Sequence, residues 1–217
     1  MFKDSSLAKS YTIEYFDMTS IVGAVDLSRG DKKSADPAMT KPIIVVSERF
    51  IPAGSLEEFK SGYLPAVDYL KKTVPGLKAI CVTQDPQDET LLHDIQIFND
   101  NEAFKQHADN TNKELMGTLM GWMSKLDQSK PLYGSVYGGW DDFAVMATQG
   151  FGAKFDFRKP SKGFIRQDTA GRDGTPLIFM FGRNLKPGTG DQYMAAAEAL
   201  YAHEHATMPG VLAHTIS

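Results

Sequence analysis

The sequence predicts an α+β protein that holds one complete unit of the order βαββαβ and a second, partial copy of that unit. Two observations carry this prediction. A segment recurs after 134 residues, and only its first copy continues into a further strand, a long helix and a last strand. The chain has 217 residues, of which 42% are hydrophobic and 23% charged, so it is ordinary for a globular protein and long enough for two small units.

The repeat aligns residues 42–83 with residues 176–217 without a gap. The matches fall on turns and helix ends: Pro42 with Pro176, Arg49 with Arg183, Gly54 with Gly188, and Pro75-Gly76 with Pro209-Gly210. Backbone geometry, rather than general hydrophobicity, selects Pro and Gly at such positions. We therefore interpret the match as a true repeat; chance similarity between two βαβ segments is the alternative.

Both copies predict the same elements in the same order. A run of β-branched or aromatic residues forms a strand, a Pro/Gly turn follows, and a capping box opens a helix that ends at Pro-Gly. The strands lie at 43–46 and 177–181, the capping boxes are Ser55 with Glu58 and Thr189 with Gln192, the helices span 56–73 and 190–207, and the second strands start at Leu77 and Val211.

The first copy then completes the unit. Thr90–Phe98 is a third strand, and Asn99 with Glu102 is a third capping box that opens a helix over 101–127. A last strand covers Tyr133–Tyr137. This order is the ferredoxin-like unit, whose antiparallel sheet carries both helices on one face. The bare face is usually covered by a second sheet, which predicts a dimeric or tandem α+β barrel.

The chain is accordingly divided into four parts: an N-terminal segment 1–41, a complete unit 42–140, a linker 141–175 and a partial repeat 176–217. Because the partial repeat stops after βαβ, it would leave unpaired strand edges. A partner subunit or residues beyond Ser217 could pair these edges, but we expect strands from Tyr11–Asp17 or from around Phe151–Phe157 to do so. Residues 28–41 and 158–175 are rich in polar residues, Gly and Pro and are expected to be loops.

Composition excludes several classes of function. The net charge of −4 argues against a nucleic-acid partner, and no apolar run is long enough for a membrane helix. The first ten residues lack the apolar core of a secretory signal. A single cysteine, Cys81, fits a reducing, cytoplasmic location, and on a strand it is expected to be a buried apolar residue rather than a nucleophile.

The end of the third strand is followed by an acidic turn and a helix that carries a histidine. The residues run from Ile97 through Phe98-Asn99-Asp100-Asn101-Glu102-Ala103-Phe104 to His107. Together with the Pro-Gly turns, this pattern resembles the antibiotic biosynthesis monooxygenase family over 42–137 in full and over 176–217 in half. The resemblance implies a homodimeric or tandem barrel that oxidises a small aromatic or polyketide-type molecule in a cleft between sheets, without metal or flavin. The substrate, once deprotonated, would itself reduce oxygen, while the protein stabilises the anion.

Some family positions hold other residues in this chain. The third strand ends in Phe98 where some members have tryptophan, and Asn112 stands where many have a second histidine on the helix. Glu48 or Arg49 falls near the position of an asparagine found on the first strand.

The candidate site residues follow from these patterns. His107 and His93 are candidate bases, since imidazole titrates near neutral pH, and Arg49 is a candidate clamp for an anion. The candidate substrate-binding residues are Arg183, Phe98, Asn112, His214 and Trp122. The structural alternatives are a packing role for His107, surface ion pairs for the arginines, a rim position for His93 and a core position for Trp122.

A cluster of His203, Glu204, His205 and His214 has the composition of a metal site but not its spacing. On a helix, His203 and His205 point in opposite directions, whereas a zinc pair needs two residues four positions apart. No metal or other cofactor is therefore expected. The alternatives to a monooxygenase-like enzyme are a non-catalytic ligand-binding or stress-response protein and a structural assembly protein on the same scaffold.

Overall fold

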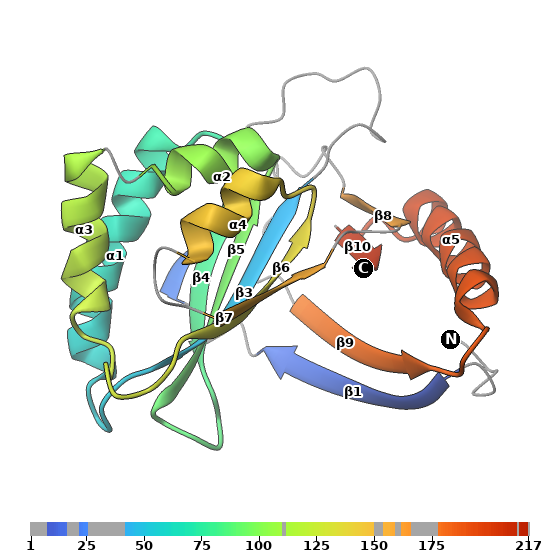
Figure 1. Ribbon diagram of the computed structural model, residues 1–217, viewed down its shortest axis with the longest axis horizontal. Helices are drawn as coiled ribbons and strands as arrows, with labels where there is room; N and C mark the ends of the chain where they lie inside the picture. The colour runs from blue at the N-terminus through green and yellow to red at the C-terminus, as the bar shows by residue number, and fades with distance from the viewer. Residues whose placement is uncertain are drawn as a thin grey trace.

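The computed structural model describes residues 8–16, 22–25, 42–109, 112–149, 154–158, 162–165, 178–211 and 213–216. Its elements form two groups (Figure 1): a sheet with helices α1 to α4, and a smaller group made by β1, β8, β9, α5 and β10. The loop expected at 28–41, and most of the loop expected at 158–175, lie outside the described residues. None of the described helices is long and apolar enough to span a bilayer.

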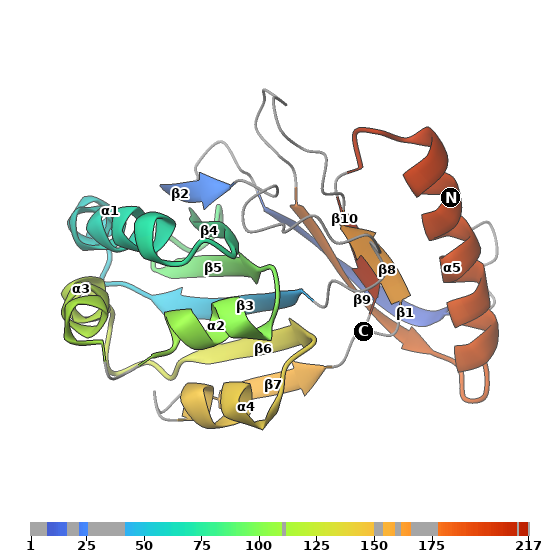
Figure 2. The same cartoon turned by 90° about the horizontal axis from the view of Figure 1, so that it is seen from above.

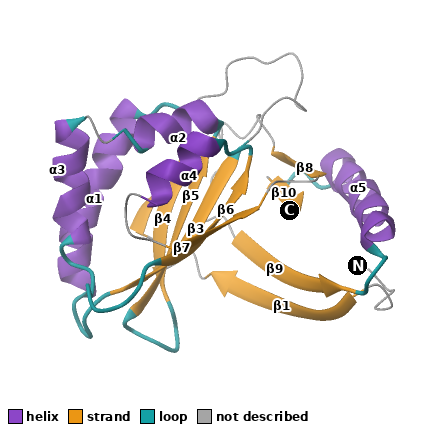
Figure 3. Cartoon of the chain, in the orientation of Figure 1, coloured by secondary structure: helices purple, strands orange, loops and turns teal. Residues whose placement is uncertain are grey.

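The first group contains the ferredoxin-like unit. Its elements are β3 (Ile43–Phe50), α1 (Leu56–Thr73), β4 (Leu77–Gln84), β5 (Leu91–Phe98), α2 (Asn101–His107), α3 (Lys113–Met123) and β6 (Tyr133–Gly138). The strands follow the order β4-β5-β3-β6, and each neighbouring pair is antiparallel. This is the order that βαββαβ requires, so the predicted fold class is confirmed (Figure 3).

Two strands that the sequence analysis did not assign to this unit extend its sheet. β2 (Val22–Val25) pairs antiparallel with β4, and β7 (Lys154–Arg158) pairs parallel with β6. The parallel pairing needs a crossover, which α4 (Asp142–Gln149) provides. The strand expected around Phe151–Phe157 therefore exists as β7, but it lies on the edge of the first unit and not beside the second copy.

The second group is built on β9 (Ile178–Leu185), α5 (Gly190–Thr207) and β10 (Ala213–Ile216). β1 (Ala8–Phe16), from the N-terminal segment, pairs antiparallel with β9. β8 (Lys162–Ile165) pairs antiparallel with β10, so these four residues are a strand where the sequence composition predicts a loop. Both pairings cover strand edges that the half repeat would otherwise leave open.

Local contacts recur at the 134-residue spacing. Gly54 and Gly188 have φ of 74° and 79°, and the helices that follow them span the predicted 56–73 and 190–207. The capping boxes are wrong, however. The side chains of Ser55 and Thr189 accept no hydrogen bond at their helices; their hydroxyls instead donate to carbonyls three residues earlier, over 2.6 and 2.8 Å. Positive φ at the preceding glycine builds a turn that brings each carbonyl within reach.

The helix predicted over 101–127 is two helices. α2 ends at His107, and α3 starts at Lys113, where the Asn112 side chain accepts a hydrogen bond from the backbone N–H of Leu115. The cap of α2 is Asp100 and not Asn99, because its carboxylate accepts from Ala103 N over 2.9 Å.

The core lies between the sheet and the helices. Alternate positions of β3 are buried, as expected of a strand with one face on a hydrophobic layer. Helices α1 and α3 pack closely at Gly62, where a Cβ would come within 3.0 Å of Gly121 O and Trp122 Cα. This close approach places the indole of Trp122 over buried polar residues of β3 and β5.

Candidate functional site

Strand register gathers four polar residues on the helix-covered face of the sheet. Ser47 and Arg49 come from β3, and Asp94 and Gln96 from the neighbouring β5. Ser47 lies directly opposite Asp94 in the antiparallel ladder. All four are buried, with exposed fractions of 8% or less. Polar groups in such a layer are costly unless they are paired, so their partners matter.

An ion pair is the centre of this cluster. Arg49 Nε lies 2.7 Å from Asp94 Oδ2, and the Asp94 side chain is fully buried. Gln96 Nε2 donates to the same carboxylate oxygen over 3.1 Å. The guanidinium carbon of Arg49 lies 4.6 Å from the ring centroid of Trp122, which is a cation–π geometry. Arg49 thus makes a buried ion pair, so the surface ion pair given as its structural alternative is wrong.

Aromatic rings enclose the pair from the helix side. Phe59 and Tyr63 of α1 stack with centroids 5.2 Å apart, and Trp122 of α3 meets both rings edge-on at 6.0 and 5.7 Å. These three side chains belong to the hydrophobic core, so the core position proposed as an alternative for Trp122 is the one observed. The same ring also contacts the charge of Arg49, so it belongs to the cluster as well.

Three buried polar atoms of the cluster have no hydrogen-bond partner among the residues that the structure describes. They are Ser47 Oγ, Tyr63 Oη and Asp94 Oδ1. Burial, and then the charge of Asp94, raise the pKa of Tyr63 well above its usual value, so its hydroxyl stays protonated. Each unmet group costs about 1–3 kcal/mol relative to a paired one, which makes three of them in one patch unusual.

His107, at the end of α2, lies beside the same layer. Its ring centroid is 5.2 Å from Phe98 and 6.5 Å from Phe104, and its Nδ1 is buried without a partner among the described residues. Burial, and then the positive charge of Arg49, lower the pKa of His107 to about 4. The imidazole is therefore neutral at physiological pH and is a weak base, though it can still donate or accept a hydrogen bond.

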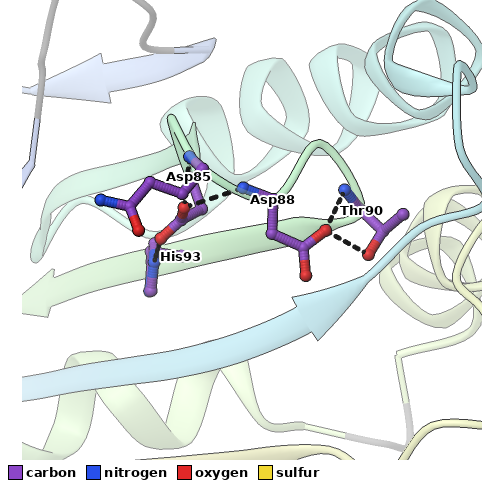
Figure 4. A network of polar contacts seen from close by, with 5 residues as sticks. Asp85, Asp88, Thr90 and His93 are labelled. Atoms are coloured by element: carbon purple, nitrogen blue, oxygen red, sulfur yellow. Dashed lines mark hydrogen bonds and ion pairs between the residues drawn. The ribbon is translucent and has the colours of Figure 1, made fainter.

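His93 lies on the opposite face of the sheet from Arg49 and Asp94, because successive strand residues alternate between faces. Its Nε2 is 3.4 Å from Asp85 Oδ2, in the turn between β4 and β5 (Figure 4). A backbone hydrogen bond from Gln87, together with His93, lowers the pKa of Asp85. In the same turn Asp88 accepts from Thr90, as Figure 4 also shows. The two candidate histidines are thus not brought together.

The other candidate residues divide between the cluster and distant positions. Phe98 is fully buried beside His107. Asn112 is exposed and caps α3, with its side chain also near the hydroxyl of Tyr69. Arg183 and His214 belong to the second group of elements. Burial raises the pKa of Cys81 to about 12, so this thiol is not a nucleophile at neutral pH.

Sequence reasoning missed Asp94, Gln96 and Tyr63. The sequence of β5 did not mark them, because Leu91, Ile95 and Ile97 make one face of the strand at least as apolar as Leu92 and Phe98 make the other; the structure shows that Asp94 and Gln96 lie on the inward face. Tyr63 has no such mark either, because tyrosine is common in cores. Among the described residues, no group of three or more metal-ligating side chains could hold a metal ion.

Comparison with protein-family models gives no match, and neither does comparison with curated proteins. Solved structures do resemble part of the chain. A candidate antibiotic biosynthesis monooxygenase from Caulobacter crescentus is 14% identical, with a TM-score of 0.41 over 47% of this chain and 92% of that one. SnoaB, a cofactor-independent oxygenase from Streptomyces nogalater, is 10% identical, with a TM-score of 0.39 over 46% and 95%. A conserved protein from Methanosarcina mazei Go1 is 16% identical, with a TM-score of 0.39 over 46% and 95%.

Proposed function

We propose that this chain is a monooxygenase-like protein whose first unit binds a small aromatic or polyketide-type molecule beneath α1 and α3. The observation that carries the proposal is the set of unmet polar atoms, Ser47 Oγ, Tyr63 Oη and Asp94 Oδ1, around one buried ion pair. A ligand hydroxyl could donate to Asp94 Oδ1 and accept from Tyr63. Its ring would contact the aromatic side chains that enclose the pair.

The proposed reaction is the oxidation of a hydroxyarene to a quinone, without metal or flavin. The substrate releases its hydroxyl proton to solvent and becomes an electron-rich anion, and this anion reduces molecular oxygen; solvent returns a proton to the oxygen atom that leaves. One oxygen atom becomes the new ring carbonyl and the other leaves as water, so the substrate supplies every electron. Arg49 would stabilise the anion, and neutral His107 would hydrogen-bond to it.

A non-catalytic ligand-binding protein is the alternative, and one observation favours it. The base nearest to the cluster is His107, and its pKa of about 4 makes it a poor proton acceptor. His93 lies on the other face of the sheet. In this alternative the same polar atoms hold a ligand that is not oxidised.

The wider organisation belongs to the same proposal. We propose that residues 176–217 are a partial second copy of the unit in 42–140. In this arrangement 1–41 supplies strands to both units, and 141–175 connects them. We also propose that the protein is a cytoplasmic homodimer. The contacts that recur after 134 residues support the internal copy: the backbone N–H of Phe59 donates to Ser55 O, and that of Tyr193 to Thr189 O.

Tyr63→Phe tests the site at little structural cost, because the hydroxyl that it removes makes no hydrogen bond of good geometry among the described residues and interacts only with Asp94. If Tyr63 is only a core residue, the variant should be as stable as the wild type and otherwise unchanged. If it binds a ligand, affinity for hydroxynaphthalenes, followed by tryptophan fluorescence, should fall about tenfold while stability holds. Tyr69→Phe on the same helix, whose hydroxyl lies near exposed Asn112, is the matched control.

Oxygen uptake then separates the two functions. We expect uptake with a panel of hydroxynaphthalenes in the wild type and in Tyr69→Phe, and reduced uptake in Tyr63→Phe and Asp94→Asn. Binding without uptake would leave the non-catalytic alternative. Equal binding by the wild type and Tyr63→Phe would remove the proposed site altogether.

A further inference from the structure

The helix of the second unit carries polar residues where the first unit has its core. The face of α5 toward the strands holds Tyr193, Ala197, Tyr201 and Glu204, and all but Glu204 are buried. The residues 134 positions earlier are Phe59, Tyr63, Val67 and Leu70. His214 on β10 likewise stands where β4 has Ile80. Phe59, Val67, Leu70 and Ile80 all belong to the core cluster of the first unit.

These polar residues make two sets of contacts, one around His214 and one around Arg183. His214 Nδ1 lies 2.7 Å from Glu204 Oε2, and the imidazole centroid is 4.3 Å from the ring of Tyr201. Arg183 Nη1 donates to the hydroxyl of Tyr193 over 2.6 Å, and its guanidinium lies 5.7 Å from that ring. We refer to Arg183, Tyr193, Tyr201, Glu204 and His214 as the α5 cluster. Figure 2 shows α5 running alongside β8 and β10, and β10 carries His214.

The cluster is electrostatically continuous. Burial is the main reason why the pKa of Tyr201 rises to about 12; Tyr193 and Glu204 raise it further, and Arg183 opposes them. The Tyr201 hydroxyl therefore interacts electrostatically with Tyr193, Glu204 and Arg183. The Glu204 side chain is only 13% exposed, whereas that of His214 is 32% exposed, so the histidine is the more open member of this pair.

A structural role explains these residues poorly. Glu204 and His214 stand where the first unit has the core residues Leu70 and Ile80, and this exchange forfeits apolar burial and desolvates a carboxylate. Natural proteins break the apolar pattern in this way mainly at functional positions. Moreover, the hydrogen bond to Glu204 uses Nδ1 and leaves Nε2 of His214 without a hydrogen-bond partner among the residues that the structure describes.

We propose that the α5 cluster is a second binding site, separate from the site of the first unit, and that it takes small acidic phenols or enols as their anions. Glu204 accepts a hydrogen bond from Nδ1–H and so orients the ring with Nε2 toward the ligand. The ligand releases its O–H proton to solvent and binds as its anion, with the anionic oxygen beside Nε2. Arg183 adds positive charge, and the ligand ring lies against Tyr201.

4-Nitrophenol is a direct probe, because its phenolate absorbs visible light whereas the neutral phenol does not. At a slightly acidic pH, at which most free probe is protonated, adding the wild-type protein should increase the phenolate absorbance in a saturable way. His214→Gln and Glu204→Gln should each weaken this signal at least about tenfold, and Arg183→Gln should weaken it less. His203→Gln, an exposed histidine on the same helix, is the matched control and should behave as the wild type.

Folding is checked on the same samples by circular dichroism and by the chemical shifts of the His214 ring. If a variant is misfolded, the ring of wild-type His214 still decides the question: the chemical shift of Nε2 should change in a saturable way when 4-nitrophenol binds. The proposal is overturned if the wild type does not raise the phenolate signal, if folded His214→Gln raises it as well as the wild type, or if Nε2 does not change. Tyr63→Phe should leave this signal intact, which separates this site from that of the first unit.

Discussion

Arg49 and Asp94 form a diagonal ion pair across β3 and β5, with 2.7 Å between Nε and Oδ2. In the ladder Arg49 faces Leu92 and Asp94 faces Ser47, so the two charged residues are offset by one inward position. Neither charge reaches water to any extent, and the indole of Trp122 covers the guanidinium. The two opposite charges therefore neutralise each other inside a buried layer that also holds Ser47 and Gln96.

Breaking this pair from one side should be far more harmful than removing both charges. Asp94→Leu leaves a buried guanidinium without its counter-ion and should lower the free energy of unfolding by about 3–5 kcal/mol. Arg49→Met combined with Asp94→Leu should recover much of that loss. Urea unfolding of the wild type, both single variants and the double variant measures the coupling. A double variant as unstable as the sum of the single variants would contradict the buried pair.

His107 should make the protein less stable in mild acid. Its pKa is about 4 in the folded state and near 6.5 when unfolded, so the unfolded chain takes up the proton first as pH falls. The stability contributed by the neutral ring is complete above pH about 6.5 and is lost between pH 6.5 and 4, amounting to about 3 kcal/mol.

His107→Phe keeps a ring beside Phe98 and removes the titrating group, so its unfolding free energy should vary less over this pH range than that of the wild type. The measurement is urea unfolding at several pH values. His93→Gln, on the other face of the sheet, is the control and should retain the pH dependence that His107 causes. Parallel pH profiles for His107→Phe and the wild type would exclude this origin.

Gly138, at the end of β6, should not tolerate a side chain. Its φ is +114°, and an added Cβ would collide with the carbonyl oxygen of Pro42. Gly138→Ala should therefore lower the melting temperature strongly. Gly54→Ala is the matched control, because Gly54 also has positive φ (+74°) but open space around the added atom, so its cost should be only about 1 kcal/mol. Equal melting temperatures for the two variants would contradict the collision.

Asn112 and Ser55 precede their helices in the same way, but only Asn112 caps. Its side chain accepts from Leu115 N over 3.0 Å, whereas Ser55 makes no such bond. Asn112→Ala should cost about 1 kcal/mol of unfolding free energy, and Ser55→Ala should cost less. Chemical denaturation of the two variants measures the difference, and a larger loss for Ser55→Ala would reverse the assignment of the caps.

Sequence patterns predicted the elements whose ends are set by local chemistry. Both long helices start and stop as expected because a glycine with positive φ precedes each and a Pro-Gly follows. The break between α2 and α3 was missed because Asn112 reads equally well as a helix surface residue and as a cap. β2 and β8 were missed because four-residue strands are defined by their partners rather than by their own composition.

The candidate site was predictable only in part. Arg49, His107, Phe98 and Trp122 were chosen from the sequence, and the structure places them in or beside one layer. His93 was chosen as well, although a strand sequence does not say which of its two faces is covered by helices. Asp94, the partner of Arg49, lies 45 residues away in the chain, and no local pattern pairs the two.

The pairing of β1 with β9 has a consequence for synthesis. Ala8 pairs with Leu185, so β1 is synthesised long before its partner strand exists. At the usual elongation rates of about 5–20 residues per second, this interval lasts about ten seconds or more. The ferredoxin-like unit, by contrast, has its β3, β4, β5 and β6 strands once Gly138 has emerged from the ribosome. We therefore expect β1 to lack its β9 partner during that interval, and an unpaired strand is a segment that chaperones recognise.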